Sequence, residues 1–124
     1  MAAVTAPAAF TARACGHHAW TIDVRTSELF DAWLSVLGPS ACVLWQRLAR
    51  EMGEGRDHFT VNDLAAYTGL MYGHVLKSLD RLERFGRVTW LMGGNVLSVE
   101  VACVPPTERQ LARAMESAAK RVTT

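Results

Sequence analysis

Four basic side chains gather between positions 77 and 87, and their type and spacing suit contact with phosphate. They are Lys77, Arg81, Arg84 and Arg87, and only the acids Asp80 and Glu83 lie among them. Ammonium and guanidinium groups bind phosphate oxygens, and arginine also forms paired hydrogen bonds with the edge of guanine. The segment therefore carries the side chains needed to bind an anionic polymer, provided that one structural element presents them together.

A second group with chemical potential is Cys15, His17 and His18, whose thiolate and imidazole groups suit zinc. No second pair of ligands follows at the spacing of a zinc finger, so we predict no metal site there. The chain also lacks a nucleophile elbow, a phosphate-cradling glycine loop and a His-Glu metal motif. We therefore predict a protein that is not an enzyme and that needs no cofactor.

The cysteines also indicate the cellular compartment. There are three, Cys15, Cys42 and Cys103, and they are far apart in the sequence. An odd, scattered set does not indicate a disulfide framework, so we predict a cytoplasmic location and small core roles for Cys42 and Cys103.

Length and composition restrict the class of protein further. The chain has 124 residues, half of them apolar, which predicts one folded domain and excludes a wholly disordered chain. Its apolar runs are too short to cross a bilayer, so no membrane association is expected. The net charge is only +1, so any affinity for nucleic acid must come from local clustering of charge.

The basic residues are predicted to lie on a helix that begins at Met71 or Tyr72 and ends at Phe85. Val75, Leu79 and Leu82 recur at helical spacing, and a glycine follows. With those three residues buried, the outward set is Tyr72, Gly73, Leu76, Lys77 and Asp80, with His74 and Arg81 on the flanks.

A shorter helix is predicted immediately before it, and a hairpin after it. Thr60 and Asp63 have the spacing of a capping box, and Gly69 supplies a left-handed end. Residues 87–92 and 96–101 are rich in β-formers and flank Gly93-Gly94-Asn95, which predicts a tight reversal.

The rest of the chain is divided into a flexible arm (1–16), a main domain (17–104) and a C-terminal helix (105–124) that is a candidate for dimerisation. Within the domain we predict a strand at 19–24, a helix from Thr26 or Ser27 to Gly38, and another helix from Ser40. Residues 58–59 are expected to form a short strand that joins the hairpin. Thr107 is expected to cap the last helix, which packs on another subunit or on the helix near Phe30. The four tryptophans are expected to serve packing.

This order of elements resembles the winged helix-turn-helix of bacterial regulators, including MarR-type repressors, and is similar to the winged helices of plasmid and phage replication proteins. The likeness is carried by Leu64-Ala65-Ala66-Tyr67-Thr68-Gly69-Leu70, by Val75 and Leu79, and by Arg81-Leu82-Glu83 and Phe85-Gly86-Arg87-Val88. The resemblance implies an α+β, mainly α, winged helix-turn-helix with extra helices at both ends. Because one module buries little surface on DNA, we also expect a homodimer that places one helix of each subunit in the major groove of double-stranded DNA.

On this basis the chain is predicted to be a small transcriptional regulator that binds duplex DNA. The predicted contact residues are Tyr72, Gly73, His74, Lys77, Ser78, Arg81, Arg84, Arg87 and Asn95. The alternative is a winged helix that binds a protein, as a replication or partition accessory or a partner of a polymerase or regulator. The sequence supports this alternative because Met71, Tyr72 and Leu76 would form an exposed apolar patch.

Overall fold

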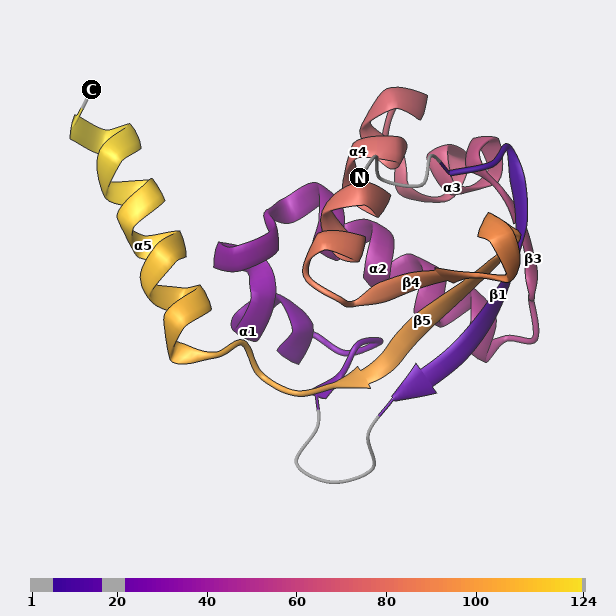
Figure 1. Cartoon of the computed structure of the whole chain (residues 1–124), viewed down its shortest axis with the longest axis horizontal. Coiled ribbons are helices and arrows are strands. Elements are labelled where there is room, and N and C mark those ends of the chain that lie inside the picture. Colours follow the sequence, from indigo (N-terminus) through magenta and orange to yellow (C-terminus); the bar gives the residue numbers. More distant parts are fainter. Residues whose placement is uncertain (1–5, 17–21, 124) are drawn as a thin grey trace.

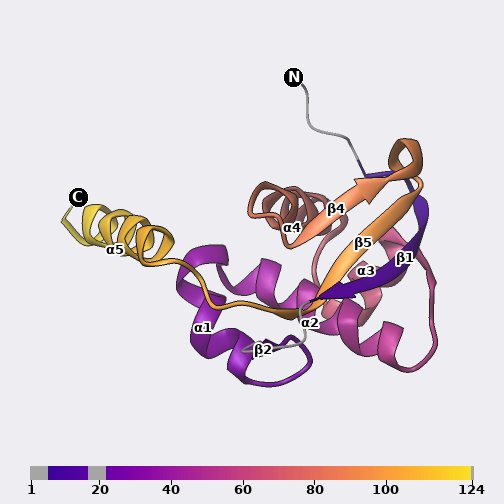
Figure 2. The same ribbon diagram turned by 60° about the horizontal axis from the view of Figure 1, so that its bottom comes forward.

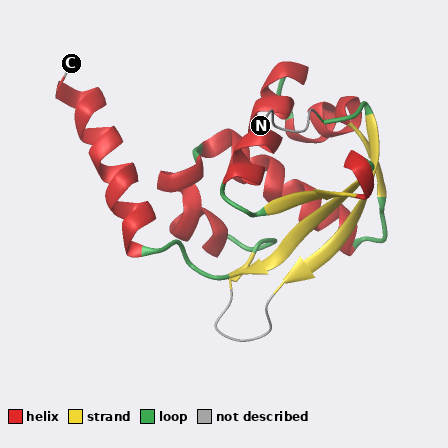
Figure 3. Ribbon diagram, in the orientation of Figure 1, coloured by secondary structure: helices red, strands yellow, loops and turns green. Residues whose placement is uncertain are grey.

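The computed structural model describes residues 6–16 and 22–123, which form an α+β fold that is about 56% helical. The α-helices of this part are α1 (Glu28–Leu37), α2 (Pro39–Gly53), α3 (Val61–Thr68), α4 (Tyr72–Arg84) and α5 (Glu108–Thr123). The strands are β1 (Ala9–Gly16), β2 (Ile22–Asp23), β3 (His58–Thr60), β4 (Val88–Leu91) and β5 (Val96–Cys103). Helices α2, α3 and α4 contact one another, and the curled sheet runs along one side of them (Figures 1 and 3).

Strand β5 is the centre of the sheet. Strand β1 runs parallel to it, with Thr11 opposite Val96 and Ala14 opposite Val99. Antiparallel β4 pairs with residues 96–99 of β5, and β2 pairs with residues 102–103, so these two strands share the other edge of β5. The short strand β3 pairs with the outer edge of β1.

The flexible arm predicted for residues 1–16 is wrong where the structure describes it, because residues 9–16 form β1. Phe10 and Ala12 point into the core and are only 4% and 6% exposed. The Phe10 ring meets Trp90 edge-on, with 5.2 Å between ring centroids, and stacks with Phe59 at 6.1 Å. Apolar residues alternate in this short strand, but the strand forms because β5 and β3 offer backbone hydrogen-bond partners on its two sides.

The position of β1 also corrects the expected role of residues 58–59. They do form a strand, β3, but it pairs with β1 rather than with the hairpin. Strand β1 already pairs with residues 96–102 of β5 on that side, so β5 has no backbone groups left there for β3. The parallel strand β1 therefore lies between the hairpin and β3 and extends the sheet beyond the hairpin.

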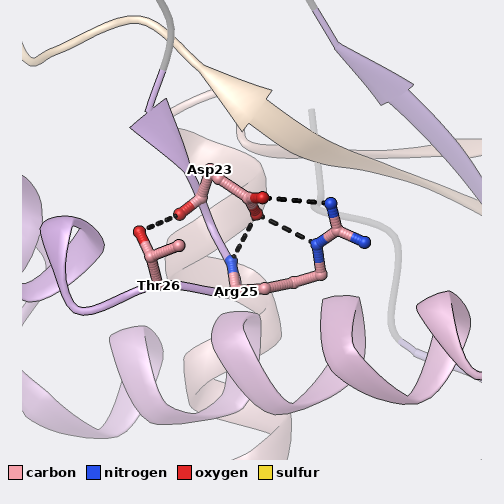
Figure 4. A network of polar contacts seen from close by, with 3 residues as sticks. All are labelled: Asp23, Arg25 and Thr26. Carbon is pink, nitrogen blue, oxygen red and sulfur yellow. Dashed lines mark hydrogen bonds and ion pairs between the residues drawn. The ribbon is translucent and has the colours of Figure 1, made fainter.

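The entry to α1 is held by a tight turn, and Figure 4 shows its polar contacts. Asp23 Oδ1 accepts hydrogen bonds from the backbone N–H of Arg25 at 2.9 Å and from its Nε at 3.0 Å. Thr26 Oγ1 donates to the backbone oxygen of Asp23 at 2.8 Å. The hydrogen bond from the Arg25 side chain lowers the pKa of Asp23. The cap predicted at Thr26 or Ser27 is Ser27, although its side chain makes no capping hydrogen bond.

Helix α1 ends at Leu37, and α2 begins two residues later with Pro39 at its first position. The second helix was expected to start at Ser40, one residue later than it does. Proline suits the first turn because its fixed φ is helical and the N–H it lacks would have no partner within the helix. The predicted strand at 19–24 appears as β2, and residues 17–21 lie outside the described part.

Tryptophans join the helices to the sheet, as their predicted packing role requires. Trp33 and Trp45 are fully buried and meet edge-on at 6.0 Å. Trp45 Nε1 donates to the backbone oxygen of Glu100 at 2.8 Å, so its one polar group is satisfied inside the core. Trp90 lies against Phe10, as noted above, and Trp20 lies outside the described residues.

The C-terminal helix α5 begins where it was predicted. Thr107 Oγ1 accepts from Gln110 N at 3.2 Å, and Thr107 N donates to Gln110 Oε1 at 2.8 Å, which is a reciprocal cap. Its first turns contact α1 of the same chain, the helix that contains Phe30, and Ala114 packs against the core. Beyond this contact α5 leads away from the rest of the fold (Figures 1 and 2).

Burial controls the reactivity of the cysteines, and this gives a prediction for alkylation. Burial raises the pKa of Cys42 and of Cys103 to about 11, whereas Cys15 is exposed. Iodoacetamide at neutral pH should therefore modify Cys15 alone in the folded protein and all three cysteines in urea, as read by mass spectrometry.

Rapid labelling of Cys42 or Cys103 without denaturant would contradict this packing.

The raised pKa values of Cys42 and Cys103 also predict a loss of stability at high pH, because the folded pKa lies above the unfolded value of 9.0. That stability is complete below pH 9 and is lost as the pH rises toward 11.

Candidate nucleic-acid interface

Helices α3 and α4 are joined by a short, well-defined turn. Thr60 Oγ1 accepts from Asp63 N at 2.9 Å and Thr60 N donates to Asp63 Oδ2 at 3.1 Å, so the predicted capping box is present. Gly69 ends α3 with a φ of 75°, where a side chain would be strained. Met71 is extended and leads directly into α4. These local features fix the direction in which α4 leaves α3.

One stripe of α4 is buried and the opposite side is open. Val75, Ser78, Leu79 and Leu82 form the buried stripe, at the i, i+3, i+4, i+7 spacing of a core-facing helix. The predicted contact residues Tyr72, Gly73, His74 and Lys77 are exposed, as expected. The structure thus places four of the predicted residues together on the open side of the first two turns.

Of the exposed lysine and arginine residues of α4, Lys77 is the one that has neither an ion pair nor a hydrogen bond in the described part of the chain. Arg84 is also exposed, but its Nη2 lies 3.1 Å from Asp80 Oδ2 one turn earlier. That pair cancels much of the charge that the sequence offers at this end of the helix. The open positive charge of α4 is therefore concentrated near Lys77.

Ser78, a predicted contact residue, and Leu76, which was predicted to face outward, are instead turned toward the protein. Ser78 is 5% exposed, because it follows Val75 by three positions and shares its stripe. Leu76 is half-buried and packs against the core. Ser78 is therefore not available to a duplex on the open side, and the expected apolar patch is reduced to Met71 and Tyr72.

Arg81 was predicted to contact phosphate or guanine, but its guanidinium is already engaged. Its Nη2 donates to the backbone oxygen of Val36 at 2.8 Å, and the guanidinium carbon lies 5.6 Å from the centre of the Phe85 ring. The carbonyl of Val36 is free to accept because it belongs to the last turn of α1. Arg81 thus ties α4 to the end of α1.

Arg87 is the clearest departure from the predicted site, because it faces the interior. Its Nη1 lies 2.9 Å from Glu100 Oε2, and the two side chains are only 15% and 11% exposed. Its Nε donates to the backbone oxygen of Phe85 at 2.8 Å, and the guanidinium carbon lies 4.8 Å from the centre of the Trp33 ring. Arg87 holds the start of β4 against β5 and α1 and is not a surface contact residue.

The tip of the hairpin differs slightly from the predicted turn. A single 3-10 turn, η1 (Met92–Gly94), carries the reversal, with φ of 52° at Met92 and 70° and 96° at the two glycines. The glycines take the positive φ angles expected of them, but Met92 joins them. Asn95 is exposed, and its Nδ2 lies 3.4 Å from the backbone oxygen of Met92. Asn95 is therefore accessible at the tip, as the predicted contact requires.

A polar cluster between α2 and α3 has no role in this surface. Glu51 is 6% exposed and accepts from Arg47 on α2, 3.1 Å away, while Arg56 Nε lies 3.3 Å from its other oxygen. Tyr67 lies between the two guanidinium groups, and its hydroxyl contacts Arg56. The Glu51 carboxylate pairs with both guanidinium groups, so the cluster braces α3 against α2.

The described residues contain no group of three or more His, Cys, Asp or Glu side chains that could hold a metal ion. Cys15 is exposed, while His17 and His18 lie outside the described part, so that metal hypothesis stays untested. None of the helices within 22–123 is both long enough and apolar enough to span a bilayer.

Comparison of the chain with protein-family models, with curated protein sequences and with solved structures gave no match. The fold alone therefore defines the class of this protein. It is an α+β protein with an α3–turn–α4 unit followed by a hairpin.

Proposed function

We propose that the chain is a winged helix-turn-helix protein that binds duplex DNA through α4. The observation that carries the proposal is the order α3, left-handed turn, α4, β4, β5, with the first two turns of α4 open at Tyr72, Gly73, His74 and Lys77. A helix of this width fits the major groove, and the preceding helix can lie against the backbone.

The contact set of this proposal is smaller than the one expected from sequence. Lys77 supplies the charge, Tyr72 supplies a hydroxyl and a ring, and Asn95 supplies an amide at the tip of the hairpin. Arg81 and Arg87 serve the fold and are left out. The proposal is for a binding protein rather than an enzyme, acting as a small transcriptional regulator in the cytoplasm.

Replacing Lys77 with alanine should weaken binding to a duplex that has been enriched from random sequences by the purified protein. If Lys77 contacts a phosphate, the affinity should fall uniformly across sequences, and the slope of log K against log salt should decrease by about one. If it contacts guanine, the loss should be roughly 1–3 kcal/mol and confined to one base position. Fluorescence anisotropy over a series of salt concentrations measures both quantities.

Arg50→Ala is the matched control, because Arg50 is an exposed cation on α2. It removes the same charge and should change the affinity and its salt dependence little. Equal losses in Lys77→Ala and Arg50→Ala would indicate a general charge effect and count against α4 as the contact helix. Failure to enrich any duplex would count against DNA binding itself.

A second function, binding of a protein partner, is favoured by the exposure of Met71 and Tyr72, which are 73% and 44% exposed at the start of α4. Two adjacent exposed apolar side chains suit a protein contact as well as a thymine methyl. Leu76 does not add to this surface, because it packs against the core. Absence of duplex enrichment would make this function the preferred one.

We also propose that two copies associate through the exposed side of α5, where Leu111 and Met115 are 36% and 72% exposed. A single module buries little surface on DNA, and a dimer reads two half-sites about one helical turn apart. A dimeric mass in solution together with a symmetric enriched duplex would support this association of two copies.

A further inference from the structure

A pocket of about 580 Å³ lies where the end of α1, the start of α2, the middle of α4 and the first turns of α5 come together. Its apolar walls include Leu34, Leu37 and Met115, and its polar lining includes Ser40, Ser78 and Arg81. Leu34 and Met115 are 40% and 72% exposed, so part of this apolar surface is open to solvent. A hollow with exposed apolar walls is a typical place for contact with a partner.

The exposed side of α5 offers an apolar surface to a second molecule. The helix contacts α1 through its first turns and then leads away from the rest of the fold (Figures 1 and 2). Leu111 and Met115 lie one turn apart on its exposed side. Ala112 and Ala119 are exposed on the same side of the helix, and their small side chains allow another surface to come close.

The position of Met115 makes the pocket and the helix parts of one self-complementary surface. Met115 lines the pocket and also protrudes from α5. In a two-fold dimer the same patch of both subunits meets itself, so a contact from the first copy to the second is repeated from the second to the first. One arrangement of two copies can therefore place the exposed side of each α5 at the pocket of the other.

The charges of the two parts of this surface are complementary. No Asp or Glu lines the pocket, and Arg81, which does, has no carboxylate partner among the described residues. One guanidinium N–H donates to Val36 O, which leaves other donors of its five for a carboxylate. On α5, Glu116 directly follows Met115, is exposed, and has no ion pair within residues 22–123. The exposed basic residues of this helix that flank it, Arg109 and Arg113, lie farther round from Met115 than Glu116 does.

We propose that a second copy of this chain fills the pocket. Met115 of the partner subunit lies against Leu34 and Leu37, and Glu116 of the partner subunit pairs with Arg81. This inference rests on the association through α5 proposed above, and it names the surface that receives the helix. The contact does not use Lys77. It fixes α4 of one copy relative to α4 of the other, as a dimer that reads two half-sites requires.

Met115→Asp tests the apolar part of the contact. Sedimentation velocity of the full chain without DNA, over a range of concentrations, gives the dissociation constant of the dimer. Met115→Asp should raise it by at least about thirtyfold, the loss typical of a side chain at the centre of an interface. Met92→Asp is the matched control, because Met92 is 75% exposed at the tip of the hairpin and should leave the constant unchanged.

An exchange of charges tests the ion pair. Arg81→Glu and Glu116→Arg should each weaken the dimer by at least about tenfold, because each homodimer then holds like charges opposite one another. An equimolar mixture of the two variants should dimerise like the parent chain, because both contacts of the mixed dimer join opposite charges. Glu54→Arg is the control, since Glu54 is exposed at the end of α2 far from the pocket.

A parent chain that is monomeric at all concentrations would overturn the proposal. A dimer that tolerates Met115→Asp would overturn the pocket contact and leave the association through α5 in place, and a mixture that stays monomeric would overturn the ion pair. Circular dichroism checks the fold of Arg81→Glu, which also loses the bond to Val36 O, and Met115→Asp keeps the test valid if that variant unfolds. DNA is absent from these measurements, so duplex binding by α4 is judged separately by the enrichment experiment.

Discussion

Arg87→Ala should lower the free energy of unfolding by about 3–5 kcal/mol, a large share of the stability of a domain of this size. The reason is that the variant removes a guanidinium that is itself only 15% exposed and lies 2.9 Å from the Glu100 carboxylate. It also removes the cation above the Trp33 ring and the hydrogen bond to Phe85 O. Urea unfolding followed by far-ultraviolet circular dichroism measures the change.

Arg84→Ala is the matched comparison for Arg87→Ala. Arg84 is also an arginine in an ion pair, with Asp80 at 3.1 Å, but its side chain is 73% exposed. Exposed pairs contribute about 0–1 kcal/mol, so Arg84→Ala should scarcely change the unfolding midpoint. Similar, small losses in the two variants would show that Arg87 is not held in the interior as described.

Phe10→Ala should destabilise the protein by about 3–5 kcal/mol, the usual range for removing a buried aromatic ring. Phe10 is 4% exposed and contacts Phe59 on β3 and Trp90 on β4. Its loss leaves a cavity that three strands line, so β1 should also separate more readily from β5. Thermal unfolding gives the size of the loss, and amide hydrogen exchange of Thr11, whose N–H donates to Asn95 O at the start of β5, gives its location.

Arg13→Ala provides the control, because Arg13 belongs to the same strand but its side chain is exposed. A surface substitution of this kind should change stability by no more than about 0.5 kcal/mol. If Phe10→Ala were equally mild, residues 9–16 would behave as the flexible arm that the sequence suggests, and the position of β1 between β5 and β3 would be wrong.

The residues explain why the arm was mispredicted. Residues 8–12 offer only one large apolar side chain, Phe10, among alanines and a threonine, which is too little periodicity to indicate a strand. The strand exists because its backbone pairs with β5 on one side and β3 on the other. Those partners are 47 or more positions away along the chain, so no local pattern reveals them.

In the candidate site, too, some features follow from local spacing and others depend on distant parts of the chain. Helical spacing was enough to predict that Val75, Leu79 and Leu82 are buried and that Lys77 is open. It could not distinguish Arg81 and Arg87 from Lys77, because all three are long cations on or beside one helix. Their partners, Val36 O and Glu100, come from α1 and β5.

The local elements of this protein follow from short stretches of its amino-acid sequence: the capping box of Thr60 and Asp63, the left-handed end at Gly69, and the amphipathic stripe of α4. These depend on backbone preferences and spacing within a few residues, which are visible in any short window. Three other features arise from the packing of distant segments: β1 inserts into the sheet, Arg87 pairs inside the core with Glu100, and Ser40 and Ser78 line one pocket. Each of these depends on groups brought together from distant parts of the chain, because burial and pairing are properties of the packed fold.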